Sequence, residues 1–530
     1  MKTTTGYILL QTLLFAYALL ALTFIFGGSV SAWLFPGAFL LAAGVTASWQ
    51  RDRRVMARAT ALSVALTALS IWLAILLPDC SYDGNYYHQS EIIHMLDGWN
   101  PYRNTEAAGI GIWERHYAKG FEMAATTVVA MTGAIESGKA VNLLLLLATG
   151  LIVYDVTGRL LPSSHSRTRL LLTLLFTLNP IGVLQAFVYY IDFTKYYYIL
   201  LTLCFTYLIC STGKRRYYWL LLGVATLAAA TKFNIFFEEG VWLIGIFIWL
   251  IIKHRNREAW GIFATGAAAV IVGGLVLGYH PYITNCLIGG NPFYPLIGGT
   301  DVDIMTSNTP AEFQGRNRFS AFFISLVKLQ APSCDSRFGG FGPLMAPLLL
   351  ISILLLAAEW KRVPGAIKAA AILCFASCFF FAQSWWARYI SQLWLVVPLT
   401  AMTMAMIGKA RFWTKTLCML AVLDICFVGM FALVKGVCYN INRDYLLGIH
   451  RGDTVRVENV NPSIIRHYRE MGTTVTELPD GSLSPDSAAL FLGNANSADA
   501  GSFPMVELTP KEYETWMELP SNRFINRRGN

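Results

Sequence analysis

Apolar runs that end at short basic clusters recur along most of this chain, and they constrain its fold more than any other feature. A run of about 20 apolar residues crosses the hydrocarbon core of a bilayer as an α-helix. Of the 530 residues, 55% are hydrophobic and only 14% are charged, against roughly 25% charged residues in a typical soluble domain. This balance excludes an ordinary soluble enzyme, a disordered chain and a disulfide-rich secreted module. We therefore expect an all-α polytopic membrane protein.

The basic clusters set the orientation of these runs. Arg51, Arg53 and Arg54 follow the second run, and the positive-inside rule places them and the N-terminus in the cytoplasm. Each later basic cluster then falls on the same side. We expect about 13 transmembrane helices in a plasma membrane, of the bacterial inner-membrane kind, with the C-terminus outside. The expected spans are 7–27, 30–49, 57–77, 138–158, 168–188, 195–211, 217–234, 241–252, 259–279, 343–358, 366–384, 391–407 and 414–434.

The distribution of polar residues divides the chain into two parts. Residues 1–434 form the expected membrane module, and 435–530, which lack apolar runs, form a small extracytoplasmic α+β domain. Within the module, 78–137 is a first outer loop with helices at the membrane interface, and an apolar stretch at 121–135 is expected as a helix at the outer surface. A large outer loop covers 280–342.

Charge and cysteine usage exclude several partners. The net charge is +9, but the basic residues lie in short clusters between apolar runs, so nucleic acid is not an expected partner. The 10 cysteines contain no Cys-x-x-Cys pair and indicate neither a zinc site nor a redox motif. Cys286 and Cys334 lie in or beside the large outer loop and are candidates for a disulfide, with Cys80 and Cys438 as alternative partners.

Acidic and aromatic residues are concentrated in the first outer loop. Asp83 precedes a short stretch whose pattern predicts a helix along the membrane surface. It could cap that helix or face a cavity as a general base. Asp79 is an alternative base. Candidate substrate contacts follow at Tyr87, His88 and Glu91.

Several cations lie at the outer ends of expected spans, where the positive-inside rule does not account for them. Lys195, Lys232 and Arg388 either extend to lipid headgroups or face a cavity, because a charge in contact with lipid is costly. Their convergence predicts an anionic partner, and a phosphate group is the simplest one. Further candidate site residues are Lys119 and His116 in the first outer loop and Tyr389 and Gln392 beside Arg388.

The order of these features resembles the GT-C superfamily of integral-membrane glycosyltransferases, which includes protein O-mannosyltransferases and lipid A aminoarabinose transferases. The resemblance covers about 57–410 and depends on the sequence of motifs and their common outer side. The motifs are Asp83 with a Tyr-His pair soon after it, Gly138, Lys139 and Asn142 at the entry to a span, Asn179 and Pro180, Tyr190 and Asp192, Lys232 at the end of a Gly-Ala-rich span, 291–295, and Arg388 with Tyr389.

This resemblance implies an inverting glycosyltransferase of cell-envelope glycan assembly. The donor would be a polyprenyl-phosphate-linked sugar, and the acceptor would be a hydroxyl of a lipid-linked glycan, a polysaccharide or a protein. Asp83 would be the catalytic base and Asp192 the second acid. Lys195, Lys232 and Arg388, and less directly Lys119 and His116, would hold the donor phosphate. No cofactor is required, although Asp83 and Asp192 could hold a divalent ion.

Other functions compete with this interpretation. A polysaccharide polymerase or ligase would also use a polyprenyl lipid and basic outer-loop residues. A transporter of lipid-linked glycans predicts charges deep in the spans and paired internal repeats, whereas the charges here lie at the outer ends and no repeat is evident. A membrane scaffold without activity would leave the clustered acids and cations unexplained.

Overall fold

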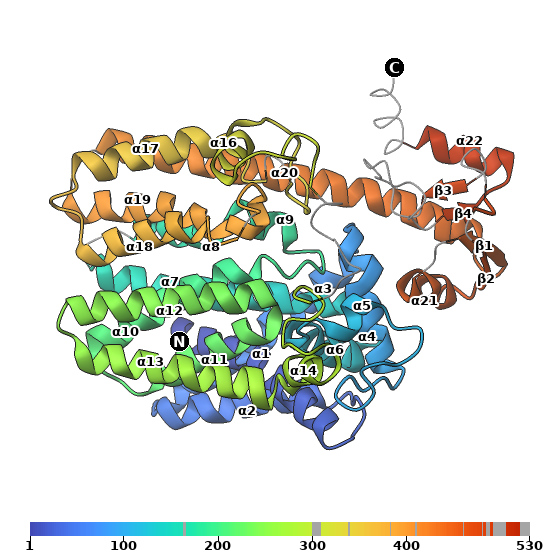
Figure 1. Cartoon of the computed structure of the whole chain (residues 1–530), viewed down its shortest axis with the longest axis horizontal. Helices are drawn as coiled ribbons and strands as arrows, with labels where there is room; N and C mark the ends of the chain where they lie inside the picture. Colours follow the sequence, from blue (N-terminus) through green and yellow to red (C-terminus); the bar gives the residue numbers. More distant parts are fainter. Residues whose placement is uncertain are drawn as a thin grey trace.

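Helices make up most of the molecule in the computed structural model (Figure 1). The structure describes residues 1–162, 166–298, 309–337, 340–381, 383–408, 411–458, 461–479, 481–483, 488–490 and 505–519. Parts of the large outer loop and of the C-terminal domain lie outside these residues. The long helices run side by side along the longest axis of the molecule, and the C-terminal domain lies at one end of them (Figure 1).

The apolar runs form the body of the molecule. A helix pairs its own backbone N–H and C=O groups, which is what an apolar segment needs in lipid. The helices of the body are α1 (Lys2–Ile25), α2 (Leu34–Trp49), α3 (Arg53–Leu76), α7 (Ala140–Leu160), α8 (Ser166–Thr177), α9 (Pro180–Gln185), α10 (Thr194–Thr212), α11 (Arg216–Thr231), α12 (Phe233–Ile252), α13 (Asn256–Val270), η3 (Ile271–Val276), η4 (Tyr279–Ile283), α17 (Met345–Ala358), α18 (Gly365–Ser377), η5 (Ala387–Leu395), α19 (Val396–Ile407) and α20 (Arg411–Ile449).

Seven helices in the described part of the chain are long and apolar enough to cross a membrane. They are Lys2–Ile25, Arg53–Leu76, Ile135–Leu160, Phe233–Ile252, Asn256–Val276, Ala387–Ile407 and Phe412–Ile449. Helical segments also overlap the other expected spans, but they are shorter or less apolar. The helices support the all-α membrane class. The count of 13 spans is not confirmed and stays a prediction.

The first outer loop is helical, as expected, but it is buried more deeply than a surface segment. It forms η1 (Gly84–His88), α4 (Gln89–Leu96), α5 (Ile112–His116), α6 (Gly120–Thr132) and η2 (Ile135–Lys139). The expected surface helix at 121–135 is instead α6, which packs against α1, α4 and α7 and is buried from Gly120 through Val129. Small residues allow this close packing, since a Cβ atom at Gly120 would lie 2.6 Å from that of Ala230.

The described part of the large outer loop contains the short helices α14 (Thr284–Gly289) and α16 (Arg318–Val327). Helix α20 continues past the expected boundary at residue 434 and ends at Ile449. There it buries Leu446 and Leu447 in a small separate core. That core is completed by a four-stranded sheet in the order β2-β1-β4-β3 and by two helices. Its elements are β1 (Thr454–Glu458), α21 (Pro462–Glu470), β2 (Thr474–Leu478), β3 (Ala488–Leu490), β4 (Met505–Glu507) and α22 (Pro510–Glu518).

Candidate functional site

A cluster of charged side chains joins four segments that are far apart in the sequence. Arg388 Nη1 lies 3.2 Å from Asp83 Oδ2, and Arg388 Nε lies 3.5 Å from Asp192 Oδ2. Lys232 Nζ donates a hydrogen bond of 2.8 Å to Asp192 Oδ1. The sequence-predicted residues Asp83, Asp192, Lys232 and Arg388 are therefore neighbours in space. We call these four residues the charged cluster.

Local backbone structure brings these side chains together. Lys232 adopts an extended conformation (φ −163°, ψ 146°) between α11 and α12, so the two helices are broken at this residue. Asp192 lies in the turn before α10, where Thr194 donates two hydrogen bonds to the carbonyl of Ile191. The backbone N–H of Arg388 donates to Ser336 Oγ at 3.1 Å. Lys232 is thus carried by a helix break and Asp192 by a turn, whereas Arg388 lies in the first turn of the short helix η5.

Asp83 is held by the tight fold of the segment around it. It precedes η1 and makes no side-chain capping hydrogen bond, so its carboxylate is free to contact Arg388. A Cβ atom at Gly84 would lie 1.9 Å from Asp79 Oδ2, so only glycine fits after Asp83. Burial, followed by the negative charge of Asp83, holds the pKa of the Tyr87 phenol well above its usual value. Tyr87 therefore lies close to this carboxylate.

A third acid, Asp335, belongs to the same environment, and the sequence did not indicate it. Asp335 Oδ1 lies 3.5 Å from Arg388 Nη1, and its Oδ2 lies 2.7 Å from Arg337 Nε. Trp386 Nε1 donates to the backbone carbonyl of Asp335 at 2.5 Å. Asp335 comes from the large outer loop, which has no hydrophobic period or motif that would have marked it.

Exposure differs sharply within the cluster. The side chains of Asp192 and Arg388 are 2% and 6% exposed, whereas those of Asp83 and Asp335 are 22% and 30% exposed. Burial opposes ionisation of Asp192, but Lys232 and Arg388 outweigh it and hold the pKa of this carboxyl below its usual value. Solvent and ligands therefore reach the cluster from the side of Asp83 and Asp335.

Aromatic rings surround the guanidinium. Its central carbon lies 4.7 Å from the ring centre of Tyr190 and 4.3 Å from that of Trp386. The ring of Tyr389 lies 5.4 Å from it and 5.4 Å from Lys232 Nζ. These contacts orient a cation by cation–π attraction, and they place the sequence-predicted Tyr389 within the site.

Lys195 and Gln392 lie outside the charged cluster. Lys195 Nζ is 3.1 Å from Glu238 Oε2 and also donates to the carbonyl of Tyr389. Gln392 is buried and donates to Ser377 Oγ at 3.0 Å. Lys195 therefore forms a buried ion pair between α10 and α12. It supports the backbone of Tyr389 and does not itself contact the carboxylates of the cluster.

The remaining sequence-predicted residues form a second buried group inside the first outer loop. Its ion pairs and hydrogen bonds are Lys119 Nζ–Glu91 Oε1 at 3.3 Å, His88 Nδ1–Glu122 Oε1 at 2.6 Å, His116 Nε2–Glu106 Oε1 at 3.2 Å and His116 Nδ1 with Asn285 Oδ1 at 2.9 Å. These contacts fix the helices of the loop to one another. Burial lowers the pKa of His116, although Asn285 and Glu106 oppose the shift.

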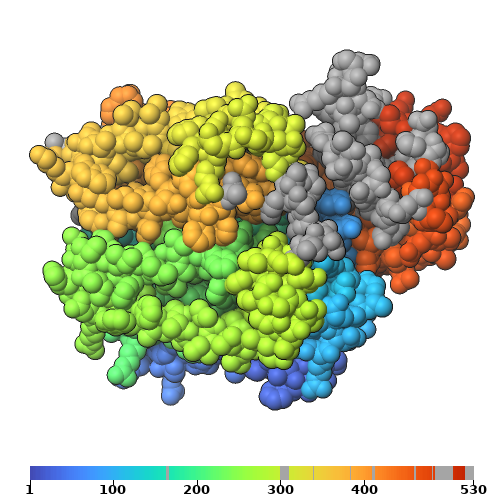
Figure 2. All heavy atoms as spheres, in the orientation of Figure 1, coloured from blue at the N-terminus to red at the C-terminus, as the bar shows by residue number. Residues whose placement is uncertain are grey.

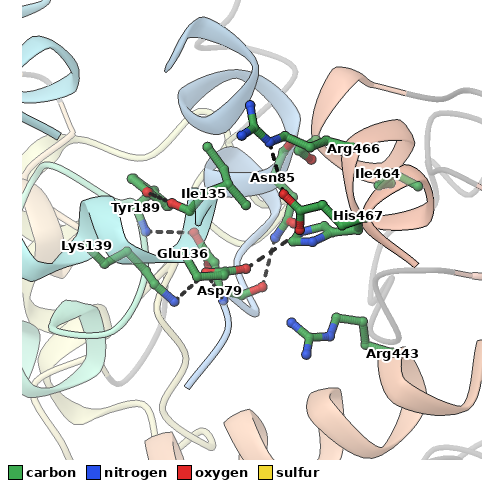
Figure 3. Close-up of polar contacts among 12 residues, drawn as sticks. Asp79, Asn85, Ile135, Glu136, Lys139, Tyr189, Arg443, Ile464, Arg466 and His467 are labelled. Carbon is green, nitrogen blue, oxygen red and sulfur yellow. Dashed lines mark hydrogen bonds and ion pairs between the residues drawn. The ribbon is translucent and has the colours of Figure 1, made fainter. Parts of the chain in front are cut away.

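Asp79, the alternative base, holds the backbone of the segment before Asp83 (Figure 3). Its Oδ1 accepts from the N–H of Ser81 and its Oδ2 from the N–H of Tyr189, both at 2.7 Å. Its own N–H donates to Glu136 Oε2 at 3.0 Å, and Glu136 pairs with Lys139 at 2.6 Å. Burial raises the pKa of Asp79 to about 6. Both of its carboxylate oxygens are therefore engaged in structural contacts.

We expect Asp79→Asn to lower the free energy of unfolding by about 1–3 kcal/mol, because an amide offers one acceptor oxygen to two backbone N–H groups. Any activity that depends on the charged cluster should remain, per folded molecule, close to that of the unchanged chain. Thermal unfolding in detergent, together with activity normalised to folded protein, measures both quantities. A variant that is fully stable but inactive would show that Asp79 takes part in the chemistry.

The C-terminal domain docks on this same segment through α21 (Figures 2 and 3). Ser463 Oγ donates to the carbonyl of Asn85 at 2.9 Å, and Arg466 Nη2 donates to the carbonyl of Gly133 at 3.2 Å. His467 Nε2 lies 3.6 Å from Glu136 Oε1. In Figure 2 the red C-terminal domain lies against the blue first outer loop. The C-terminal domain therefore holds the backbone just after Asp83 directly, and before Asp83 it contacts Glu136, the acceptor of the Asp79 N–H.

The docking of α21 should weaken in mild acid because of His467. Burial lowers the pKa of this imidazole; Glu136 and Glu470 oppose that shift, whereas Arg443 and Lys139 add to it. The undocked domain would then bind a proton more readily than the docked one, so docking loses stability as the pH falls below about 6.5, the usual pKa of histidine. The protection factors for hydrogen exchange in η1, which correct for the intrinsic slowing of exchange in acid, should fall over this range, and His467→Gln should reduce the fall. An unchanged pH profile in the variant would contradict this role.

The cysteines do not form the disulfide suggested by the sequence. All ten are free thiols, and Cys286 is exposed on α14. Cys334 packs instead beside Cys80, in a small cluster with Val188 and Tyr190. The proposed Cys286–Cys334 pair is therefore wrong: Cys334 lies beside Cys80, the alternative partner, and both thiols are free.

Chemically, the charged cluster combines a partly exposed carboxylate with two cations that are fixed in position. Arg388 bridges Asp83 and Asp192, so a divalent ion between these carboxylates would have to displace the guanidinium. Such a site can accept a proton at Asp83 and bind an anion through Arg388 and Lys232. Comparisons with protein-family models, with curated proteins and with solved structures found no match.

Proposed function

We propose that this chain is an inverting membrane glycosyltransferase of the GT-C type. It would transfer a sugar from a polyprenyl-phosphate donor to an acceptor hydroxyl at the outer face of a plasma membrane. The observation that carries the proposal is the charged cluster, in which a partly exposed Asp83 contacts Arg388 while Asp192 holds both Arg388 and Lys232, beside apolar helices. A lipid-linked phosphate would match this site, because it joins an anionic group, which cations attract, to a very apolar tail, which suits apolar helices.

The cations would act on the leaving group. As the bond between the anomeric carbon and the phosphate breaks, negative charge grows on the phosphate oxygens. Lys232 and Arg388 are held in place by Asp192 before any ligand binds. Cations fixed in this way stabilise developing charge without further reorganisation, an effect worth about 3–4 kcal/mol for a single donor in related settings.

Asp83 would remove the proton from the acceptor hydroxyl as its oxygen attacks the anomeric carbon. Attack from the face opposite the phosphate inverts the configuration at that carbon. In the structure the Asp83 carboxylate is paired with Arg388. We infer that the donor phosphate takes this place on Nη1, which would free Asp83 to act as a base only when the donor is bound.

The charge balance of the cluster favours such an exchange. The four residues of the charged cluster, two acids and two cations, have a formal charge of zero, and Asp335 beside them is shared between Arg388 and Arg337. An anionic donor therefore binds well only if one carboxylate moves away from Arg388. Asp83 and Asp335 are the two partly exposed candidates, and the buried Asp192 stays with its cations.

The remaining parts of the proposal concern the environment of the reaction. The N-terminus would be cytoplasmic and the C-terminal domain extracytoplasmic. The acceptor would be a lipid-linked glycan, a polysaccharide or a protein of the cell envelope. The reaction as written needs no cofactor, since proton transfer and phosphate stabilisation are both assigned to side chains of the chain itself.

The test is a search for the donor followed by a transfer assay. Mass spectrometry of the protein purified in mild detergent should detect co-purified polyprenyl phosphate or its glycosylated form. Extracted membrane lipids that carry labelled sugar should then lose the label to an acceptor fraction only when the protein is present. Movement of intact lipid-linked sugar between leaflets without loss of the sugar would favour a transporter and overturn the proposal.

A further inference from the structure

Two thiols from distant parts of the sequence meet near the charged cluster. Cys80 lies in the first outer loop, and Cys334 lies near the end of the large outer loop. Cys334 is buried in a small group with Val188 and Tyr190, and the half-buried thiol of the first outer loop packs against this group. The Tyr190 ring centre is 4.7 Å from the Arg388 guanidinium carbon, so the two thiols lie beside the cluster.

The backbone that carries each thiol is anchored. Gln185 Nε2 donates to the carbonyl of Cys334 at 2.7 Å. Asp79 Oδ1 accepts from the N–H of Ser81 at 2.7 Å, so a hydrogen bond joins the residues before and after Cys80. The thiols are therefore brought together by fixed segments rather than by loose loops. Bond formation would shorten their contact to about 2 Å between the sulfur atoms.

The two thiols differ in reactivity. A hydrogen bond from Cys334 is the main cause that lowers the pKa of the Cys80 thiol; burial opposes the shift, and the positive charge of Lys435 adds to it. The same hydrogen bond and burial raise the pKa of Cys334. The thiolate is the reactive form of cysteine, and Cys80 is also the less buried of the two. Cys80 is therefore the sulfur that reacts first with an oxidant.

Each thiol lies close in sequence to a carboxylate that contacts Arg388. Asp335 directly follows Cys334, and its Oδ1 lies 3.5 Å from Arg388 Nη1. Asp83 follows Cys80 within the same short segment, and its Oδ2 lies 3.2 Å from the same nitrogen. A covalent bond between the two sulfur atoms would therefore join the two segments that present the partly exposed carboxylates.

We propose that Cys80 and Cys334 form a reversible disulfide bond by exchange with a small disulfide. The Cys80 thiolate attacks one sulfur of the small disulfide, whose S–S bond breaks and releases a first thiolate. This thiolate takes up the proton of Cys334, which then attacks Cys80 Sγ and releases the second half of the small disulfide as a thiolate that takes a proton from water. The two cysteines are oxidised, and one disulfide is reduced to two thiols.

The bond would hold the two outer loops together at the charged cluster, and its reduction would release them. In the proposed orientation both cysteines lie on the extracytoplasmic side, where disulfides persist. Exchange in the purified protein depends neither on that orientation nor on the proposed sugar transfer.

The test oxidises the full chain in a non-ionic detergent. The protein is reduced with dithiothreitol, freed of it, incubated with oxidised glutathione, alkylated and digested without reductant. Mass spectrometry should find the peptides of Cys80 and Cys334 linked to each other. Oxidation should also raise the unfolding midpoint, because the bond restricts the unfolded chain, and slow hydrogen exchange at 333–336. Alkylation of both cysteines after oxidation, a link from either one to Cys438, or unchanged exchange in the linked protein would overturn the proposal.

Variants assign the order of reaction. In Cys334→Ser, Cys80 should remain bound to glutathione, because the second sulfur that would displace it is missing. In Cys80→Ser, the buried Cys334 should stay a free thiol, and neither variant should show the rise in the unfolding midpoint. Cys286→Ser is the matched control, since this thiol is exposed on α14, and it should oxidise like the unchanged chain. A full rise in the midpoint in either pair variant, or its loss in Cys286→Ser, would contradict the assignment.

Discussion

Asp83→Asn should reduce sugar transfer by about a thousandfold, the order expected when a general base is removed. Asparagine keeps the size of the side chain and can accept a hydrogen bond, but it cannot take a proton. Donor binding should be maintained or slightly strengthened, because Arg388 Nη1 no longer faces the Asp83 carboxylate at 3.2 Å. Single-turnover transfer and equilibrium binding of the donor lipid, both in detergent, separate the two effects.

Asp97→Asn is the matched control for this change. Asp97 lies in the same loop, follows α4 and is exposed, so its substitution removes a negative charge without touching the charged cluster. Its transfer rate should stay near that of the unchanged chain. If Asp83→Asn keeps near-normal turnover and Asp192→Asn is inactive, the assignment of Asp83 as the base is wrong. Normal transfer in both variants would contradict the glycosyltransferase proposal itself.

The helical framework was predictable from sequence because hydropathy is a local property. Helical segments overlap all of the expected spans, and short helices occur in the first outer loop where they were expected. The approach of Asp83, Asp192, Lys232 and Arg388 to one another was also anticipated, since charges at the same ends of apolar helices share one side of a membrane.

Other features depend on helix rotation and long-range packing, which no local pattern records. Lys195 contacts Glu238 because of the rotation of α10 about its axis relative to α12. The sequence alone does not give this rotation. Asp335 reaches Arg388 from an irregular loop. The hydrogen bond from Ser463 to Asn85 joins residues 378 positions apart, so the support that the C-terminal domain gives to Asp83 could be seen only in the folded chain.

Arg388→Gln should abolish donor binding and transfer together, because the donor phosphate is proposed to bind this guanidinium. In the structure the guanidinium contacts Asp83, Asp192 and Asp335 at 3.2–3.5 Å. It should also lower the free energy of unfolding by about 3 kcal/mol, because removal of one partner from a buried ion pair leaves the other charge uncompensated. Thermal unfolding and donor-lipid binding in detergent measure the two losses. Lys232 still pairs with Asp192 in this variant, so the chain should remain folded.

A second substitution separates the structural loss from the functional one. Adding Asp335→Asn to Arg388→Gln removes one negative charge together with one positive charge, so the net charge around the site returns to that of the unchanged chain and part of the lost stability should be recovered. It should recover neither donor binding nor transfer, because the guanidinium that would bind the donor phosphate is still missing. If the double variant regains transfer along with its stability, Arg388 serves only to hold the fold, and Lys232 alone must bind the donor phosphate.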